Sequence, residues 1–317
     1  MVSNIGAYDY SQENHYHVVI VGGGPAAVTA AIYCHRFDYK VIMIGENYGG
    51  AISRTFLVEN YPGIIGSGYD LMEKFEEHYQ KFDIPFEYER IVDIKRDESV
   101  GNGFISITTA GEKYYSDSVL VATGREHRKL NVPGEELLHG KGVSYCATCD
   151  GPFFRDEKIV VVGGSDTAAC EALFLQQFAE KVYIVYRRDE LRSEPIYTHR
   201  IEKSEKIEVI YNTNIVKING KNNVESVVFD NGEEFECGAV FIEIGANPST
   251  DLVKTLDVEL NEKGEIIVDK YCQTNVYGLF AAGDVTDIRE KQMITACGQA
   301  ATAAYSIREY FDNLVCN

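Results

Sequence analysis

Two stretches of this sequence repeat one plan and decide the fold. Val19–Ala27 reads VIVGGGPAA, and Val160–Ala168 reads VVVGGSDTA, 141 residues further along the chain. The same spacing carries the next apolar run, Val41–Ile44, onto Val182–Val185. Each copy predicts a strand, a glycine turn, a helix and a second strand, which is the βαβ unit that binds dinucleotides. One such turn is weak evidence, because ordinary strand-to-helix junctions also contain glycine, but two copies at matched spacing favour two dinucleotide sites.

The residues of these two turns have separate tasks. The first glycine permits a tight bend, the second lets the backbone approach a pyrophosphate, and the third position needs a small residue where the helix packs. Ala27 and Ala168 meet the third requirement. The predicted nucleotide contacts are Gly22, Gly24, Pro25 and Ala26 in the first turn, and Gly163, Gly164, Ser165, Asp166 and Thr167 in the second.

Both halves continue in the same way, which predicts their connection. Each has a further strand-like run, at residues 103–108 and 224–229, and each ends in a buried-strand run that stops at a glycine, Val119–Gly124 and Val240–Gly245. We therefore expect an α/β protein with two Rossmann-like, three-layer dinucleotide-binding domains, the second inserted into the first. The predicted ranges are 1–17 for an N-terminal arm, 18–128 and 246–317 for the first domain, and 129–245 for the second.

The two predicted units differ just after their second strands, where nucleotide preference is set. Glu46 follows the first of these strands, and a carboxylate there accepts hydrogen bonds from ribose hydroxyls. The second is followed by Arg187, Arg188 and Arg192, which suit a 2′-phosphate through charge-assisted bonds. The alternative is that these arginines form a solvated charged face. The position of the cluster one strand after a glycine turn instead favours a site for NADPH over NADH.

Composition limits the partners of the chain. Its 317 residues carry a formal net charge of −19, which opposes binding to nucleic acid and to anionic membrane surfaces. Residues 1–17 lack the basic start and apolar stretch of a secretory signal, so we expect a loose arm. The eight cysteines are too scattered for a disulfide framework, which favours a reducing, cytoplasmic compartment.

The run Cys146-Ala147-Thr148-Cys149-Asp150 carries the strongest chemical signal. Cys-x-x-Cys spacing lets two thiols close a small ring, and a thiolate there attacks a partner disulfide. Half of a zinc knuckle is the alternative, but the sequence has no second Cys-x-x-Cys or His-x-x-x-His partner, so we assign no metal. Asp150 is either a turn residue or a proton carrier.

A segment near the C-terminus adds a further candidate contact. Residues 274–284 read TNVYGLFAAGD, a strand-like run that closes at Gly283-Asp284. Gly283 admits a close ligand, and the Asp284 carboxylate can accept a hydrogen bond from a ribityl hydroxyl. Asp284 as a helix N-cap is the compatible alternative.

Taken together, these motifs resemble the low-molecular-weight thioredoxin reductases, in order and over nearly the whole chain. The Cys-Ala-Thr-Cys-Asp-Gly run, just ahead of the second glycine turn, is the most specific marker of that family. The other matching segments are Gly22–Ala27, Val58–Gly63, Ala122–Gly124, Arg187–Asp189 with Arg192, and Ala281–Asp284.

The resemblance implies an FAD domain in two pieces, an inserted NADPH domain that carries the cysteines, and a homodimer. It implies that Cys149 takes electrons beside the flavin, that Cys146 attacks the protein disulfide, and that Asp150 is the acid and base of thiol exchange. Rotation of the inserted domain would present nicotinamide and dithiol to the flavin in turn. Beyond the first turn, the implied FAD contacts are Glu46, Gly49, Gly50, Asn60, Thr123, Gly124, Gly283, Asp284, Lys291, Gln292 and Met293.

Several positions depart from the family pattern. Ser165 stands where a second glycine is usual, so its hydroxymethyl group either weakens NADPH binding or donates to phosphate. Ala51 replaces a glutamine and Lys291 an arginine that the family often has near the flavin, and Gly45 replaces a frequent acidic residue.

The sequence is compatible with three functions. The first is NADPH-dependent reduction of thioredoxin or a thioredoxin-like protein. The second is a related flavoprotein that oxidises small dithiols and passes the electrons to oxygen, with Ser165 marking a degraded nicotinamide site; the retained arginines oppose it. The third is a non-catalytic nucleotide-binding redox sensor, which would turn over no disulfide.

Overall fold

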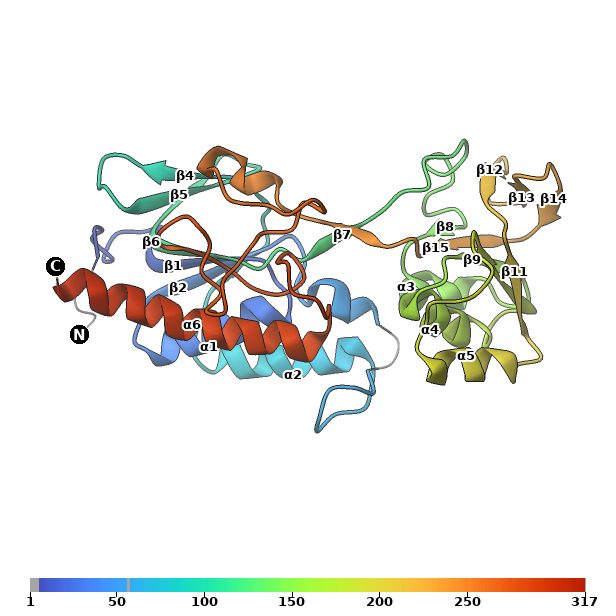
Figure 1. Cartoon of the computed structure of the whole chain (residues 1–317), viewed down its shortest axis with the longest axis horizontal. Helices are drawn as coiled ribbons and strands as arrows, with labels where there is room; N and C mark the ends of the chain where they lie inside the picture. The colour runs from blue at the N-terminus through green and yellow to red at the C-terminus, as the bar shows by residue number, and fades with distance from the viewer. Residues whose placement is uncertain (1–5, 56–57, 317) are drawn as a thin grey trace. The chain divides into compact units, whose positions relative to one another are not determined.

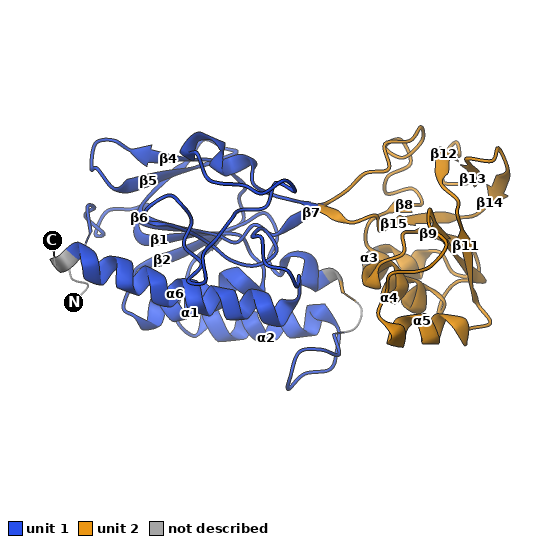
Figure 2. Ribbon diagram, in the orientation of Figure 1, with its two compact units in different colours: residues 1–53, 58–126, 247–317 blue, residues 54–57, 127–246 orange. Residues whose placement is uncertain are grey.

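The structure of the chain is a computed structural model that describes residues 6–55 and 58–316, without the side chains of Arg54, Cys149, Val315 and Cys316. It divides into two compact units (Figures 1 and 2). Unit 1 comprises residues 1–53, 58–126 and 247–317, and unit 2 comprises residues 54–57 and 127–246. The chain thus leaves unit 1 and later returns to it. The two crossing strands, β7 (Arg125–His127) and β16 (Ala246–Pro248), pair with each other.

Unit 1 is built on a seven-stranded sheet in the order β3-β2-β1-β6-β5-β4, with β17 also paired to β6. The core strands β1, β2, β3, β6 and β17 run parallel, and β4, β5 and β6 form an antiparallel extension. Its strands are β1 (His15–Val21), β2 (Val41–Ile44), β3 (Phe86–Glu87), β4 (Ile91–Asp97), β5 (Gly103–Thr108), β6 (Lys113–Val121) and β17 (Leu279–Ala281). Its helices are α1 (Pro25–Arg36), α2 (Gly68–Gln80) and α6 (Met293–Cys316), with 3-10 helices η1 (Gly50–Arg54) and η3 (Asp251–Leu256).

Strand β1 shows why this sheet has two covered faces. Successive side chains of a strand point to opposite faces. Val18 and Ile20 pack with residues of α1, α2 and α6, whereas Val19 and Val21 pack with residues of β4, β5 and η3. All four side chains are at most 3% exposed, so the uninterrupted apolar run VVIV reflects burial on both sides.

Unit 2 repeats this plan on a smaller scale. Its five-stranded sheet has the order β11-β10-β9-β15-β8, with all neighbours parallel. A separate antiparallel sheet, β12-β13-β14, belongs to the same unit. The strands are β8 (Val143–Ser144), β9 (Lys158–Val162), β10 (Lys181–Tyr186), β11 (Ile207–Tyr211), β12 (Ile215–Asn219), β13 (Ser226–Phe229), β14 (Glu234–Glu236) and β15 (Ala239–Ile242). The helices are α3 (Ala147–Asp150), α4 (Asp166–Leu175) and α5 (Pro195–Glu202), with the 3-10 helix η2 (Gly151–Phe153).

The two faces of this second sheet are also both buried. Ile159 and Val161 of β9 pack with residues of α3, α4 and α5. Val160 and Val162 face the other way and pack with residues of β12 and β13. The sheet is therefore a middle layer between helices and a second sheet, which agrees with the predicted three-layer α/β class.

The N-terminal segment differs from the expected loose arm. Tyr8 and Tyr10 are 7% and 6% exposed. The Tyr8 hydroxyl donates to Asp97 Oδ2 at 2.8 Å, and the Tyr10 hydroxyl donates to the Asp117 carboxylate. Strand β1 begins already at His15. The expectation of a loose arm was wrong for residues 8–17, because a strand at the sheet centre and two buried carboxylates give them partners far away in the sequence.

The predicted strands are found close to their expected places. The run at 103–108 is β5 itself, and the run at 224–229 contains β13, which begins two residues later at Ser226. In the part of the chain that the structure describes, no helix has both the length and the apolar character needed to span a membrane.

Candidate active site

The first glycine turn joins β1 to α1 in unit 1. Gly22 has φ +137°, and a Cβ on it would lie 2.2 Å from the carbonyl oxygen of Ala122, so no other residue fits. Gly24 caps α1 without a side-chain hydrogen bond, and the first turn of the helix has no acidic residue. A Cβ on Gly24 would meet nothing within 4 Å. Open backbone amides at a helix N-terminus fit a pyrophosphate, as FAD binding requires.

The loop after β2 lies directly against this turn. The N–H of Gly49 donates to the carbonyl of Gly23 at 2.8 Å. A Cβ on Gly50 would lie 3.3 Å from Cα of Gly24. The structure therefore brings the predicted FAD contacts Gly49 and Gly50 to the predicted phosphate site.

Other predicted FAD contacts come together from distant parts of the sequence. Asn60 Nδ2 donates to Gln292 Oε1 at 2.9 Å across 232 residues. Thr123 Oγ1 donates to the Ser249 carbonyl at 2.8 Å, and Gly124 follows with φ +65°. Met293 begins α6 and is 7% exposed.

Gly283 and Asp284 also lie at the first turn. A Cβ on Gly283, which has φ +82°, would lie 3.2 Å from Cβ of Ala26. Burial raises the pKa of the Asp284 carboxyl, while Lys291 and Arg125 act to lower it. Among the described residues no group donates a hydrogen bond to this carboxylate, which leaves it available to a ligand hydroxyl.

Lys291 and Glu46 have protein partners. Lys291 Nζ lies 3.0 Å from Glu265 Oε1 and 3.2 Å from the carbonyl oxygen of Asp284. Glu265 is only 5% exposed at its side chain, so Lys291 neutralises a buried carboxylate beside the predicted site. Glu46 follows β2 as expected, and its half-exposed carboxylate lies 3.6 Å from Arg90 Nη1.

The second glycine turn joins β9 to α4 in unit 2. Gly163 has φ +150°, and a Cβ on it would lie 2.2 Å from the carbonyl oxygen of Glu243. Ser165 is the N-cap of α4, yet its side chain makes no capping bond. Asp166 Oδ1 instead accepts the N–H of Glu194 at 2.6 Å. The Ser165 hydroxyl is therefore not hydrogen-bonded to the helix N-terminus. It can donate a hydrogen bond to an oxygen atom of a ligand.

Tyr186 connects this turn to the predicted arginine cluster. A Cβ on Gly164 would lie 2.5 Å from the Tyr186 ring, so the glycine permits the ring to pack against the turn. Arg192 Nε donates to the Tyr186 hydroxyl at 2.9 Å, and the Arg192 N–H donates to the Gly164 carbonyl at 2.7 Å. The sequence reasoning missed Tyr186, although its place at the end of a buried strand indicated a packed aromatic ring.

Arg187 and Arg188 lie exposed just after β10. Among the described residues neither guanidinium forms an ion pair. With Arg192 they leave cationic side chains near the second turn, which fits the 2′-phosphate of NADPH.

The cysteine motif forms the start of α3. Cys146 is disulfide-bonded and 8% exposed, and its Sγ lies 3.4 Å from Thr148 Oγ1. Its N–H donates to Ser144 Oγ at 3.0 Å. The side chain of Cys149 lies outside the described part of the structure. A disulfide at Cys146 favours the redox interpretation over the zinc knuckle, because zinc binds free thiolates.

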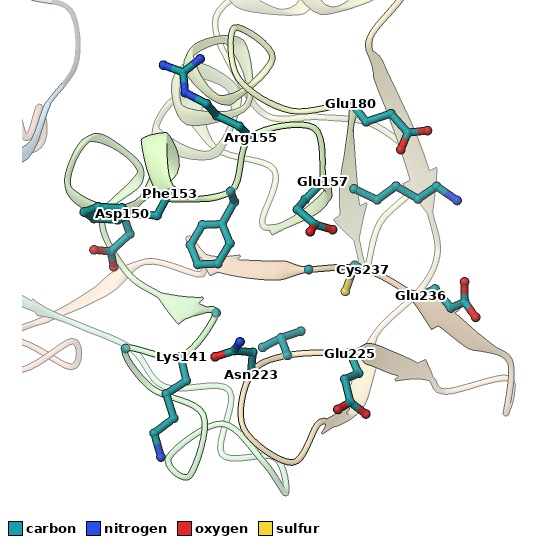
Figure 3. Close-up of a pocket in the computed structure, with 16 residues that line it drawn as sticks. Lys141, Asp150, Phe153, Arg155, Glu157, Glu180, Asn223, Glu225, Glu236 and Cys237 are labelled. Atoms are coloured by element: carbon teal, nitrogen blue, oxygen red, sulfur yellow. The ribbon is translucent and has the colours of Figure 1, made fainter.

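Asp150 borders a cavity of about 770 Å³ in unit 2. Figure 3 shows Asp150 and Phe153 at one side of it and the Cys237 sulfur and Glu157 at another. Phe153 is 80% exposed. The cysteine motif therefore adjoins an open space with both charged and apolar walls, which suits contact with a macromolecular partner better than enclosure of a small ligand.

Five described cysteines are not part of a disulfide: Cys34, Cys170, Cys237, Cys272 and Cys297. Burial raises the pKa of the thiols of Cys34 and Cys237 to about 12 and that of Cys272 to about 11. It also raises the pKa of Cys297. The thiols of Cys34, Cys237, Cys272 and Cys297 therefore stay protonated at neutral pH and are poor nucleophiles.

Glu171 and Glu243 are buried acidic residues in the same unit that the sequence reasoning missed. The N–H of Ala147, the residue after Cys146, donates to Glu171 Oε1 at 3.3 Å. Glu243 is 4% exposed and follows β15. A carboxylate in an otherwise small and apolar helix, ACEAL, was the available signal for Glu171.

Comparison with known proteins agrees with these features. A model of the pyridine nucleotide-disulphide oxidoreductase family matches residues 16–304. The thioredoxin reductase of Bacillus subtilis (strain 168) is 40% identical over 313 residues, which are 96% of this chain and 97% of that protein. The thioredoxin reductase of Peptoclostridium acidaminophilum is 42% identical over 316 residues, or 95% and 98% of the two chains. The crystal structure of Lactococcus lactis thioredoxin reductase has a TM-score of 0.89 and 38% identity, and covers 94% of this chain and 99% of that one.

The chain belongs to the pyridine nucleotide-disulphide oxidoreductase family. Within that family it stands among the low-molecular-weight thioredoxin reductases, which confirms the resemblance inferred from its motifs and the predicted fold class.

Proposed function

We propose that this protein reduces the disulfide of thioredoxin, or of a thioredoxin-like protein, with electrons that pass from NADPH through FAD to the Cys146/Cys149 pair. One observation carries the proposal: Cys146, at the head of α3 in a Cys-x-x-Cys run, is disulfide-bonded. The two-residue spacing makes Cys149 its proposed partner. Bound FAD would supply two-electron transfer between a nicotinamide and this disulfide.

The turn in unit 1 is the proposed FAD site, and the turn in unit 2 is the proposed NADPH site. The open Gly24 backbone supports the first assignment, and so does the Asp284 carboxylate, to which no described group donates a hydrogen bond. Arg192 at the Gly164 turn supports the second, and so do the guanidinium groups of Arg187 and Arg188, which pair with no acidic group among the described residues. Together they favour NADPH over NADH.

Thiol exchange then follows from the cysteine motif. The Cys146 thiolate attacks one sulfur of the partner disulfide, and the other partner sulfur leaves as a thiolate that Asp150 protonates. The Cys149 thiolate attacks the mixed disulfide next, which releases the reduced partner and restores the Cys146–Cys149 bond. Phe153, exposed on the cavity that Asp150 borders, gives the partner an apolar contact.

The proposal requires motion, because nicotinamide, dithiol and partner protein need access in turn. The crossings at β7 and β16 are the proposed hinge of a rotation of unit 2 relative to unit 1. A homodimer and a reducing, cytoplasmic compartment complete the proposal, and sedimentation of the purified protein tests the first of these.

Anaerobic mixing of the FAD-loaded protein with NADPH tests the electron route. Rapid bleaching of the flavin absorbance is expected, with a weaker response to equal NADH, and unchanged absorbance would contradict the route and favour the dithiol oxidase. Steady NADPH consumption with thioredoxin should vanish in Cys149→Ser and persist in the control Cys272→Ser, which alters a buried thiol of unit 1 that is not part of a disulfide. Absence of turnover with any disulfide protein would favour the redox sensor.

A further inference from the structure

A buried carboxylate lies beside the segment that carries Asp284. Glu265 is 4% exposed. Asn261 Nδ2 donates to Glu265 Oε2 at 2.7 Å, and the Glu265 N–H donates back to Asn261 Oδ1 at 3.0 Å. Glu265 Oε1 lies 3.0 Å from Lys291 Nζ and 3.9 Å from Arg125 Nη2. Burial acts to raise the pKa of the Glu265 carboxyl, but these hydrogen bonds and the two cations lower it overall, so the group is ionised at neutral pH.

Lys291 joins this carboxylate to the backbone. Its Nζ donates to Glu265 Oε1, to the carbonyl oxygen of Asp284 at 3.2 Å, and to the carbonyl oxygen of Thr286. A lysine ammonium group has three N–H donors, and these three oxygens account for all of them. Lys291 therefore has no N–H left for a ligand, and it holds the main chain on both sides of Val285.

Backbone hydrogen bonds hold the same segment to the residues that follow Glu265. The Ile266 N–H donates to the Val285 carbonyl, and the Asp287 N–H donates to the Ile266 carbonyl, both at 2.9 Å. The main chain after Asp284 is thus fixed, while among the described residues no group donates a hydrogen bond to the Asp284 carboxylate. A side chain that is held in this way is pre-organised for a ligand.

We propose that Glu265 and Lys291 are positioning residues for FAD: their ion pair clamps the carbonyl groups of Asp284 and Thr286, and thereby fixes the place at which the Asp284 carboxylate accepts a ribityl hydroxyl. This inference rests on the proposed function, in which Asp284 contacts FAD. Lys291 then acts on FAD through Asp284, and not by the direct contact that the family resemblance implied. Removal of its ammonium group leaves three mutually repelling oxygens without their shared donor, so the segment should shift.

The test is a double-mutant cycle on FAD binding by the full-length protein, read by flavin fluorescence. Lys291→Met keeps the length of the side chain and removes its donors, and we expect about tenfold weaker FAD binding. Asp284→Ala alone should also weaken binding about tenfold. Because Lys291 acts through Asp284, adding Lys291→Met to Asp284→Ala should weaken binding less than about twofold further. Lys254→Met, which removes the cation of an exposed ion pair with Asp251 in the same unit, is the matched control and should bind FAD normally.

Equal losses in both backgrounds would overturn the inference, because Lys291 would then act independently of Asp284, and so would an unchanged affinity in Lys291→Met. If Lys291→Met does not fold, Glu265→Gln is the second variant. It removes the charge that holds Lys291, so it should weaken FAD binding in the same way, and normal binding would contradict the proposal.

The cycle also separates this inference from the proposed function. Normal FAD binding by Asp284→Ala would refute the proposed FAD contact and this inference together. A loss in Asp284→Ala without one in Lys291→Met would refute the inference alone. The titration uses neither NADPH nor a disulfide partner, so its result does not depend on the proposed electron route.

Discussion

At the scale of single residues, the two glycine turns meet one demand with different aromatic rings. A Cβ on Gly23 would lie 3.0 Å from the Phe86 ring, and a Cβ on its counterpart Gly164 would lie 2.5 Å from the Tyr186 ring. Sequence spacing predicted both turns. It did not predict Tyr186, because the packing of a ring from the next strand on a turn depends on the twist of the sheet.

Gly24→Ala tests the proposed FAD site. Gly24 has φ −83°, which alanine adopts without strain, and the added methyl group meets no protein atom within 4 Å. We expect an unchanged melting temperature of the FAD-free protein and at least tenfold weaker FAD binding, because the methyl group occupies the space of the pyrophosphate. Flavin fluorescence titration measures the affinity. Gly298→Ala, on α6 with open space around it, is the control and should bind FAD normally.

Gly164→Ala tests the proposed NADPH site in a different way. The new methyl group would lie 2.5 Å from the Tyr186 ring and must displace it. Since the Tyr186 hydroxyl accepts from Arg192 Nε, the guanidinium should move as well. Steady-state kinetics should show KM for NADPH raised about tenfold, about 1.4 kcal/mol, while KM for thioredoxin stays the same. A larger effect on thioredoxin than on NADPH would contradict the assignment of this turn.

At the scale of elements, the packing of the N-terminal segment could not be predicted from its own sequence. Residues 6–14 contain no apolar period, and their burial depends on Asp97 of β4 and Asp117 of β6, which lie about a hundred residues later in the chain. The strands and helices that flank a glycine turn, such as β1 and α1, were predictable from the duplicated motif. Contacts of an irregular segment with distant polar groups were not.

Asp117→Asn tests this polar contact through its pH dependence. Burial raises the pKa of the Asp117 carboxyl above its ordinary value of 3.8, although bonds from Tyr10 and the Ala7 N–H act to lower it. A raised pKa of a carboxyl means that its contribution to stability is present at low pH and is lost as the pH rises through the folded-state pKa. The melting temperature of Asp117→Asn, relative to the unaltered protein, should therefore increase as the pH rises above 3.8.

Asp230→Asn is the opposite control for that measurement. Hydrogen bonds from Asn214 lower the pKa of this exposed carboxyl, so its stabilisation is present above 3.8 and lost on acidification. Its variant should lose relative stability as the pH rises. If both variants responded to pH in the same direction, the contact of Asp117 with the N-terminal segment would not act as described.

At the scale of the whole molecule, the duplicated turn and the two glycine-ended strands predicted that the chain leaves one unit and returns to it. The structure has its crossings near residues 126 and 246. The contact of the Glu171 carboxylate with the Ala147 N–H was beyond reach of the sequence, because it joins a helix interior to the cysteine motif 24 residues away.

The proposed rotation of unit 2 predicts a solvent effect on turnover. If motion about β7 and β16 limits the rate, doubling the viscosity with sucrose should lower kcat with thioredoxin by up to about twofold. Reduction of the Cys146 disulfide by dithiothreitol needs no such motion and should keep its rate when corrected for diffusion. A kcat independent of viscosity would show that another step limits the reaction.

The burial of the free cysteines has a practical consequence for anyone who follows this chemistry. Cys34, Cys237 and Cys272 stay protonated well above neutral pH. An alkylating reagent added to the native protein therefore meets a low background from these three sites. The mass added by alkylation during a short exposure can therefore report whether Cys146 is oxidised or reduced, without a label engineered into the chain.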